Sequence, residues 1–146
     1  MLAYRHAFHA GNHADVLKHI VLVQVLRYMN AKDKPYRFVD THAGAGGYSL
    51  ESRYAQKNAE ASSGIERLWG RDDLPTALAH YVALVREFNG GGNLEQYPGS
   101  PAIANLLLRP TDPLHAYELH PTDEKILRAY LAARKNTKVT LADGFA

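Results

Sequence analysis

Apolar side chains repeat every three or four residues after Asn12, which predicts a helix that this residue caps and that ends at about residue 29. A further helical pattern starts after Gly64. The next predicted helix starts at Pro75, a residue that suits the first turn of a helix, and it ends at the glycine run that starts at Gly90. Two shorter helices are predicted at residues 102–108 and, capped by Thr122, at residues 122–133.

Short apolar segments that end in polar or turn residues predict three strands. They cover residues 36–39, 114–118 and 138–142. Strands that alternate with helices indicate an α/β fold with a parallel sheet and right-handed crossovers. Parallel sheets of this kind bind ligands beyond the carboxyl ends of their strands, so the residues that follow these three segments are the first candidates for a site.

The loop after the first predicted strand reads DTHAGAGGY at residues 40–48. Its glycines allow backbone amides to approach a ligand, and a helix is predicted to follow Gly47, with its N-terminus behind the loop. A dinucleotide-binding loop would need a third glycine where Ser49 stands, and a P-loop would need Gly-Lys-Ser/Thr. The remaining pattern, an acid and then Gly-x-Gly after a strand, is similar to the first motif of S-adenosylmethionine-dependent methyltransferases. A tight strand-to-helix turn without a ligand is the alternative.

Acidic residues also end or follow the other two predicted strands. Glu118 could accept hydrogen bonds from ribose hydroxyls, or it could be a surface acid beside His120. Asp143 could accept a hydrogen bond from an adenine amino group, with the Gly144 amide nearby, or it could be a simple turn residue. His42 lies in an exposed glycine loop, where its ring has no packing role, so a ligand contact is expected. Asp40 could orient the loop amides or cap the turn.

The composition excludes several classes of protein. The 146 residues are enough for one domain or part of one, and the absence of cysteine excludes disulfides and thiolate metal sites and fits a reducing cytoplasm. We recognise no signal peptide and no apolar run long enough to span a membrane. Residues 1–37 carry six basic and two acidic side chains, a net charge of +4. This excess indicates either a polyanionic partner or a solvated helix face.

Cationic and aromatic side chains are mixed at the N-terminus: Tyr4, Arg5, His6 and Phe8. This mixture is typical of surfaces that stack an unpaired base and hold its phosphate, although a frayed terminus is the alternative. A small metal site made by His6, His9 and His13 is a further alternative.

The chain as a whole closely resembles the RlmJ family of bacterial 23S ribosomal RNA adenine-N6 methyltransferases. The resemblance rests on YRHAFHAGNHADVLKH, DTHAGAGGY, YPGSP, ELHP and ADGF, and it extends from Met1 to the last residue. It implies a Rossmann-like class I methyltransferase domain at residues 1–52 and 96–146, with its first three strands, and a small helical insertion at residues 53–95. It also implies methyl transfer from S-adenosylmethionine to the N6 amino group of one adenine of 23S rRNA, in the cytoplasm and without a metal or a membrane.

The resemblance assigns roles to individual residues. Cofactor contacts carry over onto His19, His42, Ser100, Glu118, Asp143 and Gly144. Tyr4 matches a position that contacts RNA, and Lys18 in the same motif is expected to act on the substrate side. Without the resemblance, Ser100 reads as a helix N-cap and His19 as a structural histidine.

The family is also defined by an Asp-Pro-Pro-Tyr motif after its fourth strand, and this sequence does not contain that motif. We therefore expect a truncated chain that is inactive alone, with the catalytic aspartate beyond Ala146. The first strand would normally lie between the second and fourth strands. Its free edge is expected to make this chain self-associate, whereas the full-length enzyme is expected to be a monomer. The alternative function is a non-catalytic RNA- or nucleotide-binding module, which would bind RNA without the cofactor.

Overall fold

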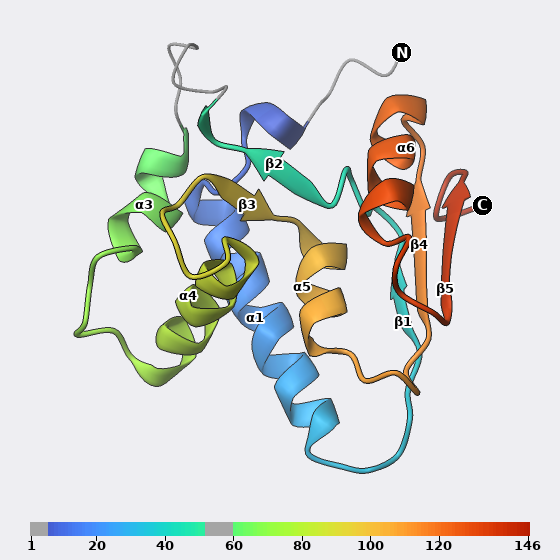
Figure 1. Cartoon of the computed structure of the whole chain (residues 1–146), viewed down its shortest axis with the longest axis horizontal. Helices are drawn as coiled ribbons and strands as arrows, with labels where there is room; N and C mark the ends of the chain where they lie inside the picture. Colours follow the sequence, from blue (N-terminus) through green and yellow to red (C-terminus); the bar gives the residue numbers. More distant parts are fainter. Residues whose placement is uncertain (1–5, 52–59) are drawn as a thin grey trace. The chain divides into compact units, whose positions relative to one another are not determined.

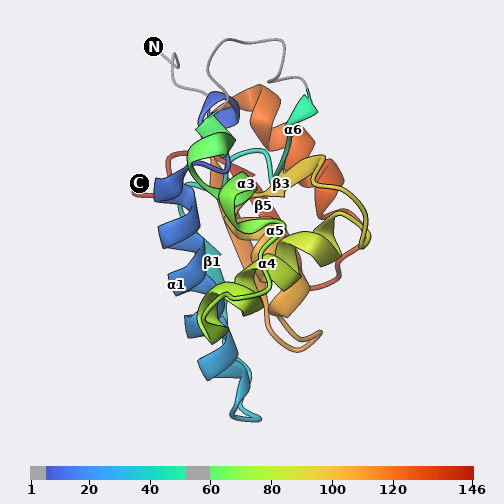
Figure 2. The same ribbon diagram turned by 90° about the vertical axis from the view of Figure 1, so that its left-hand side faces the viewer.

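A computed structural model describes residues 6–51 and 60–146 of the chain (Figure 1; Figure 2 shows it from the side). The chain divides into two compact units. Unit 1 comprises Met1–Gln24 and Tyr48–Pro98, and unit 2 comprises Val25–Gly47 and Gly99–Ala146. Each unit is built from segments that are distant in sequence, and each is described by itself.

Unit 2 contains a three-stranded parallel sheet in the order β1-β4-β5. Its strands are β1 (Phe38–Asp40), β4 (Leu114–Glu118) and β5 (Thr137–Leu141). Helices α5 (Ser100–Leu107) and α6 (Pro121–Tyr130) precede and follow β4 in the chain and pack against the sheet (Figure 1). The α/β class, the parallel sheet and the three predicted strands are confirmed, with strand bounds shifted by at most two residues.

The two faces of this sheet differ in burial because neighbouring side chains of a strand point to opposite faces. Leu114, Ala116 and Val139 share one face and are buried. Val39 and Lys138 share the other face and are exposed. The hydrophobic core of unit 2 therefore lies on one side of the sheet.

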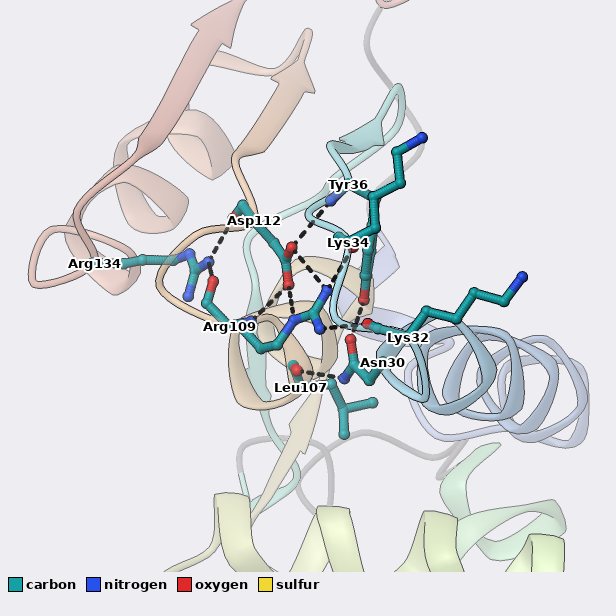
Figure 3. A network of polar contacts seen from close by, with 8 residues as sticks. All are labelled: Asn30, Lys32, Lys34, Tyr36, Leu107, Arg109, Asp112 and Arg134. Atoms are coloured by element: carbon teal, nitrogen blue, oxygen red, sulfur yellow. Dashed lines mark hydrogen bonds and ion pairs between the residues drawn. The ribbon is translucent and has the colours of Figure 1, made fainter.

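A cluster of hydrogen bonds around Arg109 fixes the amino-terminal end of the sheet (Figure 3). The Arg109 guanidinium donates to the carbonyl oxygens of Lys32 at 2.7 Å and Lys34 at 3.0 Å. It also donates to the buried carboxylate of Asp112 at 2.9 Å, and Arg134 donates to the Asp112 carbonyl oxygen at 2.8 Å. Burial alone would raise the pKa of Asp112, but the bonds from Arg109 and from backbone amides hold it below its usual value. The cluster joins the segments that lead into all three strands.

Unit 1 combines helices with a two-stranded sheet. Its elements are η1 (His6–Phe8), the first part of α1 (His13–Asn30), β2 (Gly47–Ser49, of which Gly47 belongs to unit 2), η2 (Glu60–Ser63), α3 (Ile65–Leu68), α4 (Thr76–Phe88) and β3 (Gln96–Pro98). Ile65, Tyr81 and Tyr97 are fully buried and form the centre of its core. The predicted helical insertion at 53–95 lies within this unit together with the first 24 residues. The domain boundaries derived from the sequence stay a prediction.

The predicted cap of the first helix is confirmed, because the Asn12 side chain accepts the Asp15 amide at 2.9 Å. The helix predicted to follow Gly47 does not begin at once, since residues 47–49 form β2, which pairs with β3. Glu51 is helical, and the rest of that prediction falls on 52–59, outside the described residues. The strand β2 therefore comes between the glycine loop and this helical residue.

Three predicted helix starts are shifted or wrong. Pro75 is the N-cap of α4 and precedes its first turn, although the helix ends before Gly90 as expected. His120 is the N-cap of α6 in place of Thr122, because Pro121 lacks an N–H and suits the first helical position. Ser100 lies inside α5, after the N-cap Gly99. Within residues 6–51 and 60–146, none of the helices combines the length and apolarity needed to cross a bilayer.

Candidate functional site

Asp40, the last residue of β1, holds the start of the glycine loop in place. One of its carboxylate oxygens accepts the His42 amide at 3.1 Å, and the other accepts the Ser100 hydroxyl at 2.5 Å. Burial raises the pKa of Asp40 above its usual value, although the bond from Ser100 opposes this effect. Asp40 thus both caps the turn and joins β1 to the start of α5. The sequence left open which of these roles it has.

Glu118, the last residue of β4, holds the middle of the loop. Its Oε2 accepts the Gly44 amide at 2.7 Å, and its Oε1 accepts the His120 amide at 2.8 Å. The neighbouring Ala43 amide donates to the Tyr117 carbonyl oxygen at 3.0 Å. A carboxylate offers about four acceptor positions, so each Glu118 oxygen retains one for a ligand.

The last two glycines of the loop, Gly46 and Gly47, stand where a side chain would be strained or would clash with a neighbouring residue. Gly46 has a φ of +89°, which a side chain rarely adopts, and its carbonyl oxygen accepts the Gly99 amide at 2.8 Å. A Cβ on Gly47 would lie 2.8–2.9 Å from the Tyr130 ring and hydroxyl on α6. The glycines therefore let the loop pass between α6 and the start of α5. The sequence offered no signal for Tyr130.

The segment after β5 meets the same loop. A Cβ on Gly144 would lie 2.2 Å from the Thr41 carbonyl oxygen, so the two backbones are in direct contact. The His42 and Phe145 rings meet edge to face, with centroids 4.8 Å apart. Asp143 is exposed and accepts the Phe145 amide at 2.9 Å through Oδ1, whereas its Oδ2 has no hydrogen-bond partner in the described part of the chain.

Five of the six residues expected to contact the cofactor lie in unit 2, at the carboxyl ends of its three strands. They are His42, Ser100, Glu118, Asp143 and Gly144. The contacts with Asp40, Gly44 and Thr41 connect them into one rim. The sixth, His19, belongs to unit 1.

His19 is a buried residue of α1, with 7% of its surface exposed. Its Nδ1 lies 2.7 Å from the Tyr97 hydroxyl, and the two rings stack. Burial lowers the pKa of His19 to about 4, so the ring is neutral at pH 7. His19 and Tyr97 are 78 positions apart in the sequence.

The N-terminal motif is organised around the buried carboxylate of Asp15. This carboxylate lies 2.6 Å from His6 Nε2 and 3.0 Å from Lys18 Nζ, and it accepts the Gly11 amide. Burial alone would raise the pKa of Asp15, but its hydrogen bonds with His6 and Lys18 and its charge interactions with His6 and His19 lower it to about 2. The Lys18 side chain is 63% exposed. Tyr4 lies outside the described residues.

The proposed histidine metal site has no support in the part of the chain that can be described. His6 lies against Asp15, and His9 Nδ1 lies 2.9 Å from Glu60. Among residues 6–51 and 60–146, no group of three or more His, Cys, Asp or Glu side chains could hold a metal ion. His6 instead joins η1 to α1, and His9 joins the segment after η1 to η2.

Comparisons with known proteins agree with the resemblance in the motifs. A family model described as "Ribosomal RNA large subunit methyltransferase D, RlmJ" matches residues 33–146. Ribosomal RNA large subunit methyltransferase J of Escherichia coli (strain K12) is 51% identical over 145 residues, which cover 99% of this chain and 52% of that protein. The protein of the same name from Haemophilus influenzae is 48% identical over 146 residues, with the same coverage.

A crystal structure of a Legionella pneumophila protein has the same fold. It aligns with a TM-score of 0.84 and 39% identity over 93% of this chain and 50% of that one. The chain spans about half the length of the curated relatives it matches. Its fold is α/β and Rossmann-like, and the chain belongs to the RlmJ family of ribosomal RNA large-subunit methyltransferases.

Proposed function

We propose that this chain is the cofactor-binding part of an S-adenosylmethionine-dependent enzyme that methylates the N6 amino group of one adenine in 23S rRNA. The observation that carries the proposal is the rim at which the Glu118–Gly44 and Gly144–Thr41 contacts join three strand ends and a glycine loop. The names of the two curated relatives support ribosomal RNA as the substrate and methyl transfer as the reaction.

The residues of the rim suit the cofactor. When bound, S-adenosylmethionine supplies an electrophilic methyl group on a sulfonium. Glu118 has acceptor positions left for ribose hydroxyls, and Asp143 Oδ2 is available to an adenine amino group. The exposed His42 ring, held between Thr41 and Phe145, and the Ser100 hydroxyl complete the polar lining on the proposed cofactor side.

The RNA would be recognised through the N-terminal motif. The Lys18 side chain is exposed, and its ion pair with the buried Asp15 carboxylate holds the ammonium group in place, so it can contact a phosphate without losing its position. The role of Tyr4 in stacking a base stays a prediction. A target adenine has to leave its stack before its amino group can reach the methyl group.

The transfer step needs a group that holds the amino nitrogen, because the lone pair of an adenine amine is delocalised into the ring. The Asp-Pro-Pro-Tyr motif that would provide it does not occur in the 146 residues, so no catalytic residue is assigned here. The contribution of these residues is positioning of the cofactor, which can supply much of the rate of an in-line displacement.

Self-association of the isolated chain is a further part of the proposal. Among the described strands, β1 pairs with β4 alone, and Val39 of β1 is 50% exposed. An unpaired apolar edge is a template for pairing with another copy. A monomeric full-length enzyme and a cytoplasmic location both remain predictions.

Titration calorimetry with S-adenosylhomocysteine tests the cofactor site. We expect one site per chain and a roughly tenfold loss of affinity in Asp143→Asn, equal to about 1.4 kcal/mol. Glu87→Gln, an exposed acid of α4, serves as the control and should bind normally. Absence of heat together with an unchanged melting temperature would contradict the proposal. RNA binding without cofactor binding would favour the non-catalytic RNA-binding module.

A further inference from the structure

Exposed cations gather at the amino-terminal end of the parallel sheet in unit 2. The segments that lead into its three strands are residues 31–37, 109–113 and 131–136, and Lys138 follows within β5. One acid of this region, Asp33, is exposed, whereas five basic side chains are exposed: Lys32, Lys34, Arg37, Lys135 and Lys138. These five cations, which we call the basic end, and Asp33 give this surface a net charge of +4.

Tertiary contacts bring the cations of the basic end together. The Arg109 guanidinium donates to the carbonyl oxygens of Lys32 and Lys34, and Arg134 donates to the Arg109 carbonyl oxygen at 3.0 Å. Lys135 follows Arg134 and is therefore held near residues that are far away in the sequence. Because these bonds use only the backbone of Lys32 and Lys34, their side chains extend away from the cluster (Figure 3).

No neighbouring acid neutralises the basic end. Within residues 6–51 and 60–146, the side chains of its five cations have no ion-pair partner, and the buried Asp112 is bonded to Arg109 instead. The strand register places Lys138 beside His115. Burial and then the positive charges of Lys138 and Arg37 lower the pKa of His115 below its usual value. The basic end therefore has a positive potential that attracts a polyanion.

The opposite end of the same three strands has the opposite charge. Asp40, Glu118 and Asp143 lie there, and none of the residues of the rim is a lysine or an arginine. A phosphate backbone would be repelled by these carboxylates and attracted to the basic end.

The basic excess of residues 1–37 is explained in part by this arrangement. Lys32, Lys34 and Arg37 make up half of its six basic side chains. All three follow Asn30, the last residue of α1, so they do not belong to a solvated helix face. A polyanionic partner is the explanation that remains for these three residues.

We propose that the basic end is an RNA-contacting surface, which holds the phosphate backbone of the ribosomal RNA while the target adenine lies at the rim. The inference rests on the proposed function where it names ribosomal RNA. Lysine ammonium groups are point charges that suit phosphates, and such contacts position an RNA without reading its sequence. A strand of five residues spans about 17 Å, so a folded RNA is large enough to contact both ends of the sheet.

Fluorescence anisotropy of a labelled short RNA duplex, measured over a series of salt concentrations, tests this surface. A triple variant with Lys32→Gln, Lys34→Gln and Lys135→Gln removes three charges and leaves the backbone bonds of Arg109 intact. We expect the slope of log affinity against log salt concentration to become less steep by about 2–3. The affinity at low salt should fall about tenfold or more.

The matched control removes three exposed cations from other parts of the chain, with Arg67→Gln, Arg71→Gln and Lys125→Gln. It has the same net charge as the first variant and should keep the salt dependence of the unchanged chain. An equal change in both triple variants, or no change in either, would overturn the inference. The first variant should bind S-adenosylhomocysteine normally, and a parallel loss of cofactor binding would also overturn it.

Proton NMR of the His115 ring tests where the duplex lies, with His115→Gln to assign the resonance. Phosphates at the basic end would offset the charges of Lys138 and Arg37, so the pKa of His115 should rise when the duplex is bound. A duplex that binds without changing this pKa would overturn the inference. If the unchanged chain binds S-adenosylhomocysteine but no RNA duplex, the inference falls while the proposed cofactor site stands.

Discussion

The side chain of Glu118 is bonded to the backbone of Gly44, with 2.7 Å between Oε2 and the amide nitrogen. The bond joins the end of β4 to the loop after β1 and spans 74 positions of the sequence. The second oxygen accepts the His120 amide at the start of α6. One carboxylate therefore sets the position of two segments that border the candidate cofactor site.

Glu118→Gln should weaken this arrangement, because both partners of the carboxylate are N–H donors and the amide group of glutamine can accept only one of them. We expect a loss of about 1–2 kcal/mol in the free energy of unfolding in urea. The same exchange at the exposed Glu87 should change it by less than about 0.5 kcal/mol. Equal effects at the two positions would show that the bond to Gly44 is unimportant.

Gly144→Ala should separate the segment after β5 from the glycine loop, because the added methyl group would meet the Thr41 backbone at 2.2 Å. The His42 ring should then lose its contact with Phe145, which a change in its NMR ring-current shift would report. S-adenosylhomocysteine affinity should fall about tenfold. Gly70→Ala has open space around the new methyl group and provides the control. A normal His42 resonance in Gly144→Ala would refute the close contact.

Acid should reduce stability in two separate pH ranges. Burial lowers the pKa of His19 from 6.5 to about 4, so the unfolded chain binds the proton first and stability falls as the pH drops from 6.5 to about 4. Despite its burial, Asp15 has a pKa lowered from 3.8 to about 2, so its contribution is present above 3.8 and is lost towards 2. Urea unfolding at a series of pH values should show the upper range flattened in His19→Phe and the lower range flattened in Asp15→Asn. A rise in stability on acidification would contradict both assignments.

Arg109→Lys should destabilise unit 2 by about 2–3 kcal/mol, because a lysine cannot bond the carbonyls of Lys32 and Lys34 and the buried Asp112 at once (Figure 3). Arg71→Lys is the control, since Arg71 also pairs with a carboxylate but both side chains are exposed. Its effect should stay below about 0.5 kcal/mol in the same unfolding measurement. If the two variants lose equal stability, the Arg109 cluster does not hold the strand starts.

Val39→Lys should reduce self-association of the isolated chain, because a charge on an edge strand discourages pairing with another copy. Sedimentation velocity over a range of concentrations measures the change. Leu17→Lys places the same charge on an exposed apolar residue of α1 and should leave self-association intact. An unchanged protein that stays monomeric at high concentration would rule out pairing through β1.

The positions of the three strands of the parallel sheet could be predicted because their signals are local. Leu114–Glu118 is an apolar segment that ends in an acid, and the structure has β4 at the same bounds. The strand β2 could not be predicted, since Gly47–Ser49 becomes a strand only by pairing with Gln96–Pro98. Sequence spacing also placed Ser100 as a helix cap, whereas its hydroxyl bonds to Asp40, 60 positions away.

The sequence by itself determined the family, the parallel sheet and the gathering of His42, Glu118 and Asp143 at strand ends, because motif identity and hydrophobic pattern are properties of neighbouring residues. Only the tertiary structure decided which atoms of these groups are already bonded. The bonds of Glu118 to Gly44 and of His19 to Tyr97 join residues more than 70 positions apart. Such pairs depend on how the chain packs, and packing brings together side chains whose separation in sequence carries no signal.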